Sequence, residues 1–211
     1  MPRVYLVVDH YTTPYFKQLA KIHSRFFITN PLAFPTTVFK QFDVIVDNGT
    51  YTHGKPRYSY CIRALRMNVR FIMPDYLASP ERTLREHIRF IEFIECNMPS
   101  LAKRVRKLGF VVLQGRTYDE YLQALDTLKE HLIFDKVAIG GLRRIKQQLA
   151  LQLALQLRKK YYVHVLGTQC KYAHSFDTSW WGYRFLDQRK GKINNAIERI
   201  KQFIQRWESL P

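Results

Sequence analysis

Residues 110–120, Phe-Val-Val-Leu-Gln-Gly-Arg-Thr-Tyr-Asp-Glu, carry the pattern that decides the fold. The run from Phe110 to Leu113 is apolar at every position, which is typical of a parallel strand buried on both faces. Thr117 then opens a helical pattern, and Glu120 stands three positions later, as in a capping box. A buried strand followed at once by a capped helix is the unit from which α/β folds are built.

The same order of strand and helix recurs along the chain. Short, β-branched runs predict eight strands, at 4–8, 25–29, 44–46, 70–73, 110–113, 136–139, 162–165 and 175–177. Eight such units favour one compact (β/α)8 TIM barrel over residues 1–211, with a last helix at about 192–209. The usual barrel has about 250 residues, so we expect tight loops and reduced helices. An open doubly wound sheet is the competing fold, although no Gly-x-Gly-x-x-Gly or Walker lysine loop supports nucleotide binding in it.

The predicted helices differ in clarity along the chain. Ser79 is a predicted N-cap, and an apolar stripe follows it at Leu84, Ile88, Ile91 and Ile94. The first third is less regular, with a helix predicted at 14–22 behind Thr13 as its cap, and a loop at 30–35.

Composition narrows the class of protein. The chain of 211 residues is 46% hydrophobic and 24% charged, which is typical of a globular protein. Its net charge of +17 suits a polyanion, and we favour nucleic acid over an anionic membrane surface or a basic protein without such a partner. The apolar runs are too short to span a membrane. The three cysteines form no Cys-x-x-Cys pair, which favours a cytoplasmic protein without disulfides or a cysteine zinc site.

Polar residues and glycines follow the predicted strands. In a parallel barrel these strand ends meet on one rim, where the active sites of such barrels lie. Each residue also has an ordinary explanation, because Asp often caps helices and Asn-Gly often makes turns. His164, inside a predicted strand, is interpreted as structural. The coincidence at seven strand ends nevertheless indicates a site.

Six of these segments, in this order, resemble the tRNA-guanine transglycosylase family. They are Asp47-Asn48-Gly49-Thr50-Tyr51, Asp75, Leu113-Gln114-Gly115-Arg116, Ile139-Gly140-Gly141-Leu142, Val165-Leu166-Gly167 and Phe176-Asp177. The resemblance extends over about residues 44–180. It implies a (β/α)8 barrel that exchanges a guanine in a polynucleotide for a 7-deazaguanine base.

The resemblance also assigns roles to residues of this chain. Asp177 is implied to be the nucleophile that attacks C1′ of the nucleotide, and Asp47 the second carboxylate, which handles protons on the departing and arriving bases. The implied substrate-binding residues are Tyr51, Asp75, Gln114, Gly140, Gly141, Leu166 and Gly167. Tyr51 and Leu166 would sandwich the base ring. No cofactor and no metal are expected in the chemical step, because a carboxylate can displace the base without a Lewis acid.

This chain departs from the family's tRNA enzymes at several points. It has no Cys-x-Cys-x-x-Cys…His zinc site, and Thr50, Thr52 and Arg116 stand where the family has other residues. We therefore expect a minimal barrel without the zinc subdomain, closer to relatives that insert 7-deazaguanine into DNA, with RNA as the other candidate substrate. Basic residues expected to hold phosphates near the pocket are Arg116, Arg143, Arg144, Arg184, Arg189 and Lys190.

Two other classes of function stay open on the sequence. The first is a barrel that binds nucleic acid without catalysis. The second is an unrelated barrel glycosidase or nuclease that uses the same carboxylates, although a nuclease favours clustered Asp, Glu and His around a metal.

Overall fold

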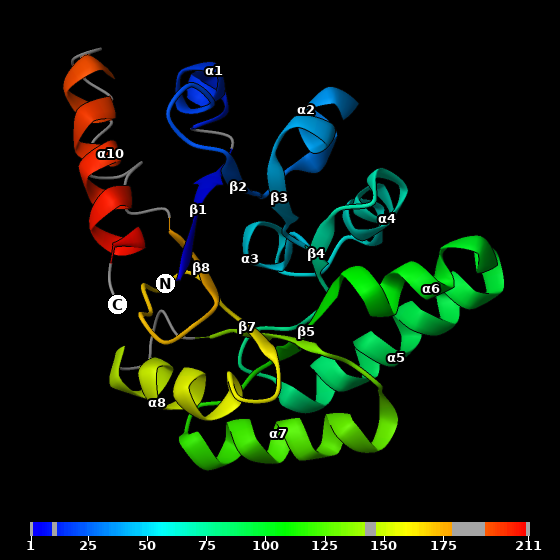
Figure 1. Cartoon of the computed structure of the whole chain (residues 1–211). Helices are drawn as coiled ribbons and strands as arrows, with labels where there is room; N and C mark the ends of the chain where they lie inside the picture. Colours follow the sequence, from blue (N-terminus) through cyan, green and yellow to red (C-terminus); the bar gives the residue numbers. More distant parts are fainter. Residues whose placement is uncertain (1, 10–11, 142–146, 179–192, 210–211) are drawn as a thin grey trace.

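Eight parallel strands close into a barrel in chain order, with β8 hydrogen-bonded to β1 (Figure 1). The computed structural model describes residues 2–9, 12–141, 147–178 and 193–209. The strands are β1 Arg3–Val8, β2 Arg25–Ile28, β3 Asp43–Val46, β4 Arg70–Ile72, β5 Gly109–Leu113, β6 Lys136–Ile139, β7 Tyr162–Val165 and β8 Ser175–Thr178. The predicted barrel and its eight strands are confirmed, each strand within one residue, and the open sheet is excluded.

Helices surround the barrel and differ in length between its two halves. The helical segments are η1 Thr13–Tyr15, α1 Phe16–Leu19, η2 Pro31–Ala33, α2 Thr36–Gln41, α3 Thr50–His53, α4 Tyr58–Met67, α5 Pro80–Asn97, α6 Pro99–Leu108, α7 Tyr118–His131, α8 Gln147–Leu157 and α10 Ile193–Glu208. The short segments between β1 and β3 confirm that some helices are reduced. The predicted loop at 30–35 is corrected, because it contains the 3₁₀ turn η2.

The N-cap residues predicted from the sequence are confirmed at some helices and wrong at others. The Thr117 hydroxyl accepts a hydrogen bond from the Glu120 backbone N–H, as predicted for α7. Ser79 stands at the N-cap of α5, but its side chain makes no capping bond there. The predicted Thr13 cap is wrong: Thr12 precedes the first turn, because its hydroxyl and backbone N–H both donate to the Asp9 carboxylate.

The buried face of α5 also needs correction. It consists of Thr83, His87, Phe90 and Ile94. Ile94 of the predicted stripe is therefore confirmed as buried, whereas Leu84, Ile88 and Ile91 are only half-buried beside this face. The reason is aromatic packing, since the Phe90 ring fills the space beside Tyr58 and Phe71 with centroids 4.9 and 6.0 Å away.

The apolar core has two layers. One fills the barrel interior and consists of Tyr5, Val7, Phe27, Ile45, Ile72, Phe110, Val112 and Ala138. The other lies between the strands and the surrounding helices. There α10 packs beside β1 and β8 (Figure 1), where Trp207 meets the Phe176 ring at 5.1 Å.

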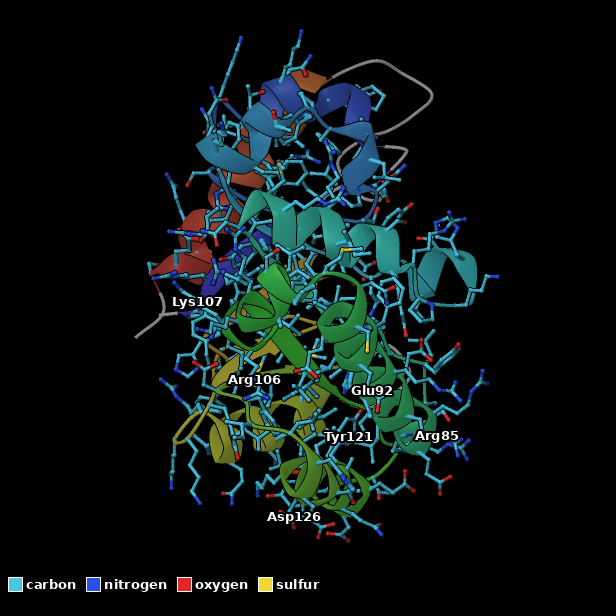
Figure 2. The ribbon with its side chains drawn as sticks, turned by 90° about the vertical axis from the view of Figure 1, so that its right-hand side faces the viewer. Arg85, Glu92, Arg106, Lys107, Tyr121 and Asp126 are labelled. Carbon is cyan, nitrogen blue, oxygen red and sulfur yellow. The ribbon has the colours of Figure 1, made fainter. Side chains whose placement is uncertain are left out.

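The outer faces of the long helices are charged. Figure 2 shows the side formed by α5, α6 and α7, where Arg85, Arg106, Lys107 and Asp126 are exposed. Tyr121 of α7 is fully buried and reaches the barrel instead. None of the helices in the described ranges is both long and apolar enough to cross a bilayer.

Candidate active site at the carboxyl ends of the strands

A tight turn of Asp47, Asn48 and Gly49 follows β3. Gly49 has φ +84°, a left-handed conformation that favours glycine. The buried Asn48 side chain fixes the turn from both ends, because its Oδ1 accepts from the Thr50 N–H at 2.8 Å and its Nδ2 donates to the Met73 carbonyl at 2.8 Å. The segments after β3 and β4 are therefore tied together.

Asp75, after β4, lies at the centre of a buried amide network. Its Oδ1 accepts from Asn48 Nδ2 at 2.6 Å and its Oδ2 from Gln114 Nε2 at 2.5 Å. Burial raises the pKa of Asp75, and the two amide donors oppose that rise. The predicted pair Asp75 and Gln114 is thus brought together, with each side chain bonded to the other. Each carboxylate oxygen keeps a second lone pair that a base edge could use.

Gly140 and Gly141 pack directly against Gln114. A Cβ on Gly140 would lie 2.5 Å from Gln114 Nε2, so only glycine leaves room for this amide. Gly141 has φ +76°, which also favours glycine. The Tyr121 hydroxyl donates to the Gly140 carbonyl at 2.5 Å. The two glycines therefore hold Gln114 in place beside Asp75.

Asp177 lies inside β8, where it pairs in register with Tyr5 of β1. Its carboxylate is buried, and Oδ1 accepts from the Gly167 backbone N–H at 3.0 Å. The same Oδ1 is 3.2 Å from His164 Nε2. Because Asp177 belongs to a strand, it is not a helix cap, which was the main structural alternative for this residue.

His164, which the sequence analysis interpreted as structural, lies beside Asp177. It is fully buried in the barrel interior, its Nδ1 is 2.9 Å from Ser175 Oγ, and its ring stacks on Phe27 at 5.7 Å. Alternation along β8 places Ser175 and Asp177 on one face, and His164 is the register partner of Ser175. That alternation was the available signal, but it depends on the pairing of β7 with β8.

Asp47 is a strongly perturbed carboxyl of this rim. Burial, followed by the carboxylates of Asp75 and Asp177, raises its pKa to about 7. Backbone N–H groups of Asn48 and Gly49 act in the opposite direction. A carboxyl with such a pKa can both donate and accept a proton near neutral pH, as general acid–base catalysis requires.

The remaining predicted site residues are less closely grouped. Tyr51 is 64% exposed on α3, whereas Leu166 packs against the apolar barrel interior. Their sandwich around a base stays a prediction. Arg116 is exposed after β5, and its backbone N–H donates to Glu120. The other basic candidates lie outside the described residues: Arg143, Arg144, Arg184, Arg189 and Lys190.

Within the described ranges, no group of three or more His, Cys, Asp or Glu side chains is arranged to hold a metal ion. No protein-family model matches the chain, and no curated protein matches it either.

Proposed function

We propose that the chain is a base-exchange glycosyltransferase that replaces guanine in a nucleic acid, DNA in preference to RNA, with a 7-deazaguanine base. The observation that carries the proposal is the pairing of two unlike carboxyls on one rim. Asp177 accepts a hydrogen bond from the Gly167 backbone N–H and lies 3.2 Å from His164 Nε2, whereas Asp47 has a raised pKa. Environments that separate two carboxyls in this way are typical of nucleophile and acid–base pairs.

The first step uses both carboxyls. A carboxylate oxygen of Asp177 attacks C1′ of the nucleotide and forms an ester as the bond from C1′ to N9 of guanine breaks. The bond electrons stay on the departing base, which takes a proton from Asp47. The transition state resembles an oxocarbenium ion, so the negative charge of Asp177 stabilises it.

The second step reverses the first with another base. The incoming 7-deazaguanine loses its N9 proton to Asp47 and attacks C1′. The ester bond breaks, and its electrons return to the Asp177 carboxylate. Asp47 ends the cycle protonated, as it began, which requires a pKa near the working pH.

Asp75, Gln114 and the Gly140–Gly141 backbone are proposed to read the guanine edge. Their grouping after β4, β5 and β6 supports this role. A flipped-out base would meet this network beside the two carboxyls. The net charge of +17 would retain the flanking phosphates.

Base exchange is tested by incubation with labelled guanine and either duplex DNA or tRNA, with incorporation into acid-precipitable polymer as the readout. We expect label in DNA, and retention of activity after treatment with a chelator. Exchange into tRNA alone would correct the substrate, and activity that needs added metal would favour the nuclease alternative.

A barrel that binds nucleic acid without catalysis is the second candidate. The internal pairing of Asp75 with Gln114 favours it, because both groups are satisfied without a base. The two candidates differ in covalent chemistry. Acid quenching of the enzyme with DNA and no incoming base should trap a protein–DNA ester in the first case and none in the second.

A further inference from the structure

The imidazole of His164 is fully buried in the barrel interior, beneath Asp177. We propose that His164 is a positioning residue for Asp177: it fixes Oδ1 from below and so assigns the attack on C1′ to Oδ2. This inference rests on the proposed function for the identity of the attacked atom. The arrangement of the two side chains does not depend on that function, because it is given by the distances between them.

His164 is held in one orientation by the rings around it. Its plane is 5° from that of Phe27, at 5.7 Å, and its edge meets Tyr5 at 5.9 Å and Phe110 at 5.7 Å. The residue is fully buried. A ring clamped on three sides in a close-packed interior has few alternative rotamers, so its nitrogens keep fixed directions.

The partners of the two ring nitrogens select a tautomer. Ser175 Oγ lies 2.9 Å from Nδ1 and can donate its hydroxyl proton there. Nε2 then carries the proton and donates to Asp177 Oδ1 across 3.2 Å. A carboxylate only accepts hydrogen bonds, so this tautomer suits an ionised Asp177.

Two donors therefore converge on one oxygen of the nucleophile. Gly167 N–H reaches Oδ1 at 3.0 Å, beside the imidazole. Oδ2 accepts no hydrogen bond from any side chain or backbone group in the described ranges. The oxygen without a donor is the more nucleophilic one, while the bonded oxygen keeps the carboxylate from rotating.

Two titratable groups, from β1 and from the end of β3, face this pair. Asp47 follows β3 and interacts electrostatically with Asp177, and Tyr5 of β1 contacts the imidazole. Neither is altered by substitution at 164. Loss of the Nε2–H donor removes one of the two contacts that orient Oδ1 and leaves the Asp177 carboxylate freer to rotate.

The experiment compares His164→Gln with His164→Phe. The Gln amide can place an N–H near the Nε2 position, whereas Phe keeps an aromatic ring against Phe27 and offers no donor. We expect His164→Phe to lower kcat for base exchange about 10- to 100-fold, the range typical of lost supporting hydrogen bonds, with KM for DNA almost unchanged. His164→Gln should retain most of the wild-type kcat.

A second readout does not need activity. Carbon-13 labelling of aspartate carboxyls gives a resonance for Asp177, assigned as the one missing in Asp177→Asn. An Asp177 carboxyl chemical shift that moves in His164→Phe and returns towards the wild-type value in His164→Gln supports the proposal. Identical Asp177 chemical shifts in all three proteins overturn it, as does a Gln variant that loses as much activity as the Phe variant.

The design separates this inference from the proposed function. If the wild-type protein exchanges no base, the proposed function fails, and the Asp177 chemical shifts still decide whether His164 holds Asp177. If His164→Phe does not fold, Ser175→Ala takes its place. It removes the partner of Nδ1, and we expect a smaller shift of the same Asp177 resonance. No shift in that variant overturns the role assigned to the imidazole.

Discussion

The two ends of the barrel handle charge in opposite ways. At the amino ends of the strands, the guanidinium of Arg70 forms an ion pair with Asp43 and donates to the Tyr5 hydroxyl at 2.6 Å, and that hydroxyl donates to Asp43 at 2.7 Å. At the carboxyl ends, Asp47, Asp75 and Asp177 stand close enough for Asp47 to be perturbed by both others. One end joins opposite charges, and the other gathers like charges.

The pKa values express this difference. At the carboxyl-end rim, burial raises the pKa of both Asp47 and Asp75, so folding opposes their ionisation. At the amino end, the guanidinium compensates the charge of Asp43, and the hydrogen-bonded phenol of Tyr5 stays protonated because burial raises its pKa. The amino-end network therefore stabilises the barrel. The carboxyl-end network lowers the stability of the folded state, but it supplies carboxyls with raised pKa values, which acid–base chemistry can use. Such a division is general among these barrels.

Replacement of Asp177 should have the largest effect. Asp177→Asn keeps the size of the side chain and its contact with Gly167, but an amide is not a nucleophile of this kind. We expect base exchange to fall by at least about 10³-fold and the trapped ester to disappear. Thermal unfolding and DNA binding should stay close to wild type. A variant with wild-type exchange would show that Asp177 is not the nucleophile.

Replacement of Arg70 should affect stability instead of chemistry. Arg70→Met removes the cation bonded to the Tyr5 hydroxyl and leaves the partly buried Asp43 carboxylate with Arg3 Nη1, 4.0 Å away. Removal of one partner of a buried pair costs about 3–5 kcal/mol, and partial exposure reduces this to about 2–3 kcal/mol. Urea unfolding measures the loss, and kcat per folded molecule should not change. A large loss of kcat would contradict the separation of the two ends.

Replacement of Asp47 should stabilise the fold and slow the reaction. The pKa of Asp47 is raised from 3.8 to about 7, so the folded state holds a proton that the unfolded chain releases. Wild-type stability therefore falls as the pH rises from about 4 to about 7. Asp47→Asn has no such charge and should be more stable by about 2 kcal/mol at pH 8, after allowance for partial exposure, with no difference below pH 4.

Urea unfolding of Asp47→Asn and wild type at both pH values tests this expectation. Its base exchange should be impaired at every pH, because no acid remains to protonate the departing base. Equal free energies of unfolding of the two proteins at pH 8 would mean that burial and like charges at this rim do not destabilise the folded state.

The barrel could be predicted from the sequence because its signals are local. Apolar runs such as Phe110–Leu113 and the capping box at Thr117 depend only on neighbours in the chain. The grouping of Asp75, Gln114 and Gly140 also followed, since parallel strand ends share a rim. The contact of His164 with Asp177 could not be predicted, because Asp177 belongs to another strand and the register is set by strand pairing. The buried face of α5 was predicted incorrectly in part for a similar reason, because the Phe90 ring packs against Tyr58 of α4 and Phe71 of β4.

The smallest expected effect concerns single exposed cations at the two ends of β5. Arg116 follows the carboxyl end of this strand, and Lys107 precedes its amino end, on α6 (Figure 2); both are exposed. If nucleic acid approaches the carboxyl-end rim, Arg116→Gln should remove about one phosphate contact and reduce the slope of log Kd against log salt by about 1. Lys107→Gln removes the same charge from the opposite end and should leave the slope unchanged. DNA binding measured between about 50 and 200 mM salt gives both slopes. Equal changes in the two variants would mean that the net charge alone attracts the polyanion, and a larger change for Lys107 would place the nucleic acid at the end of the barrel away from Asp177.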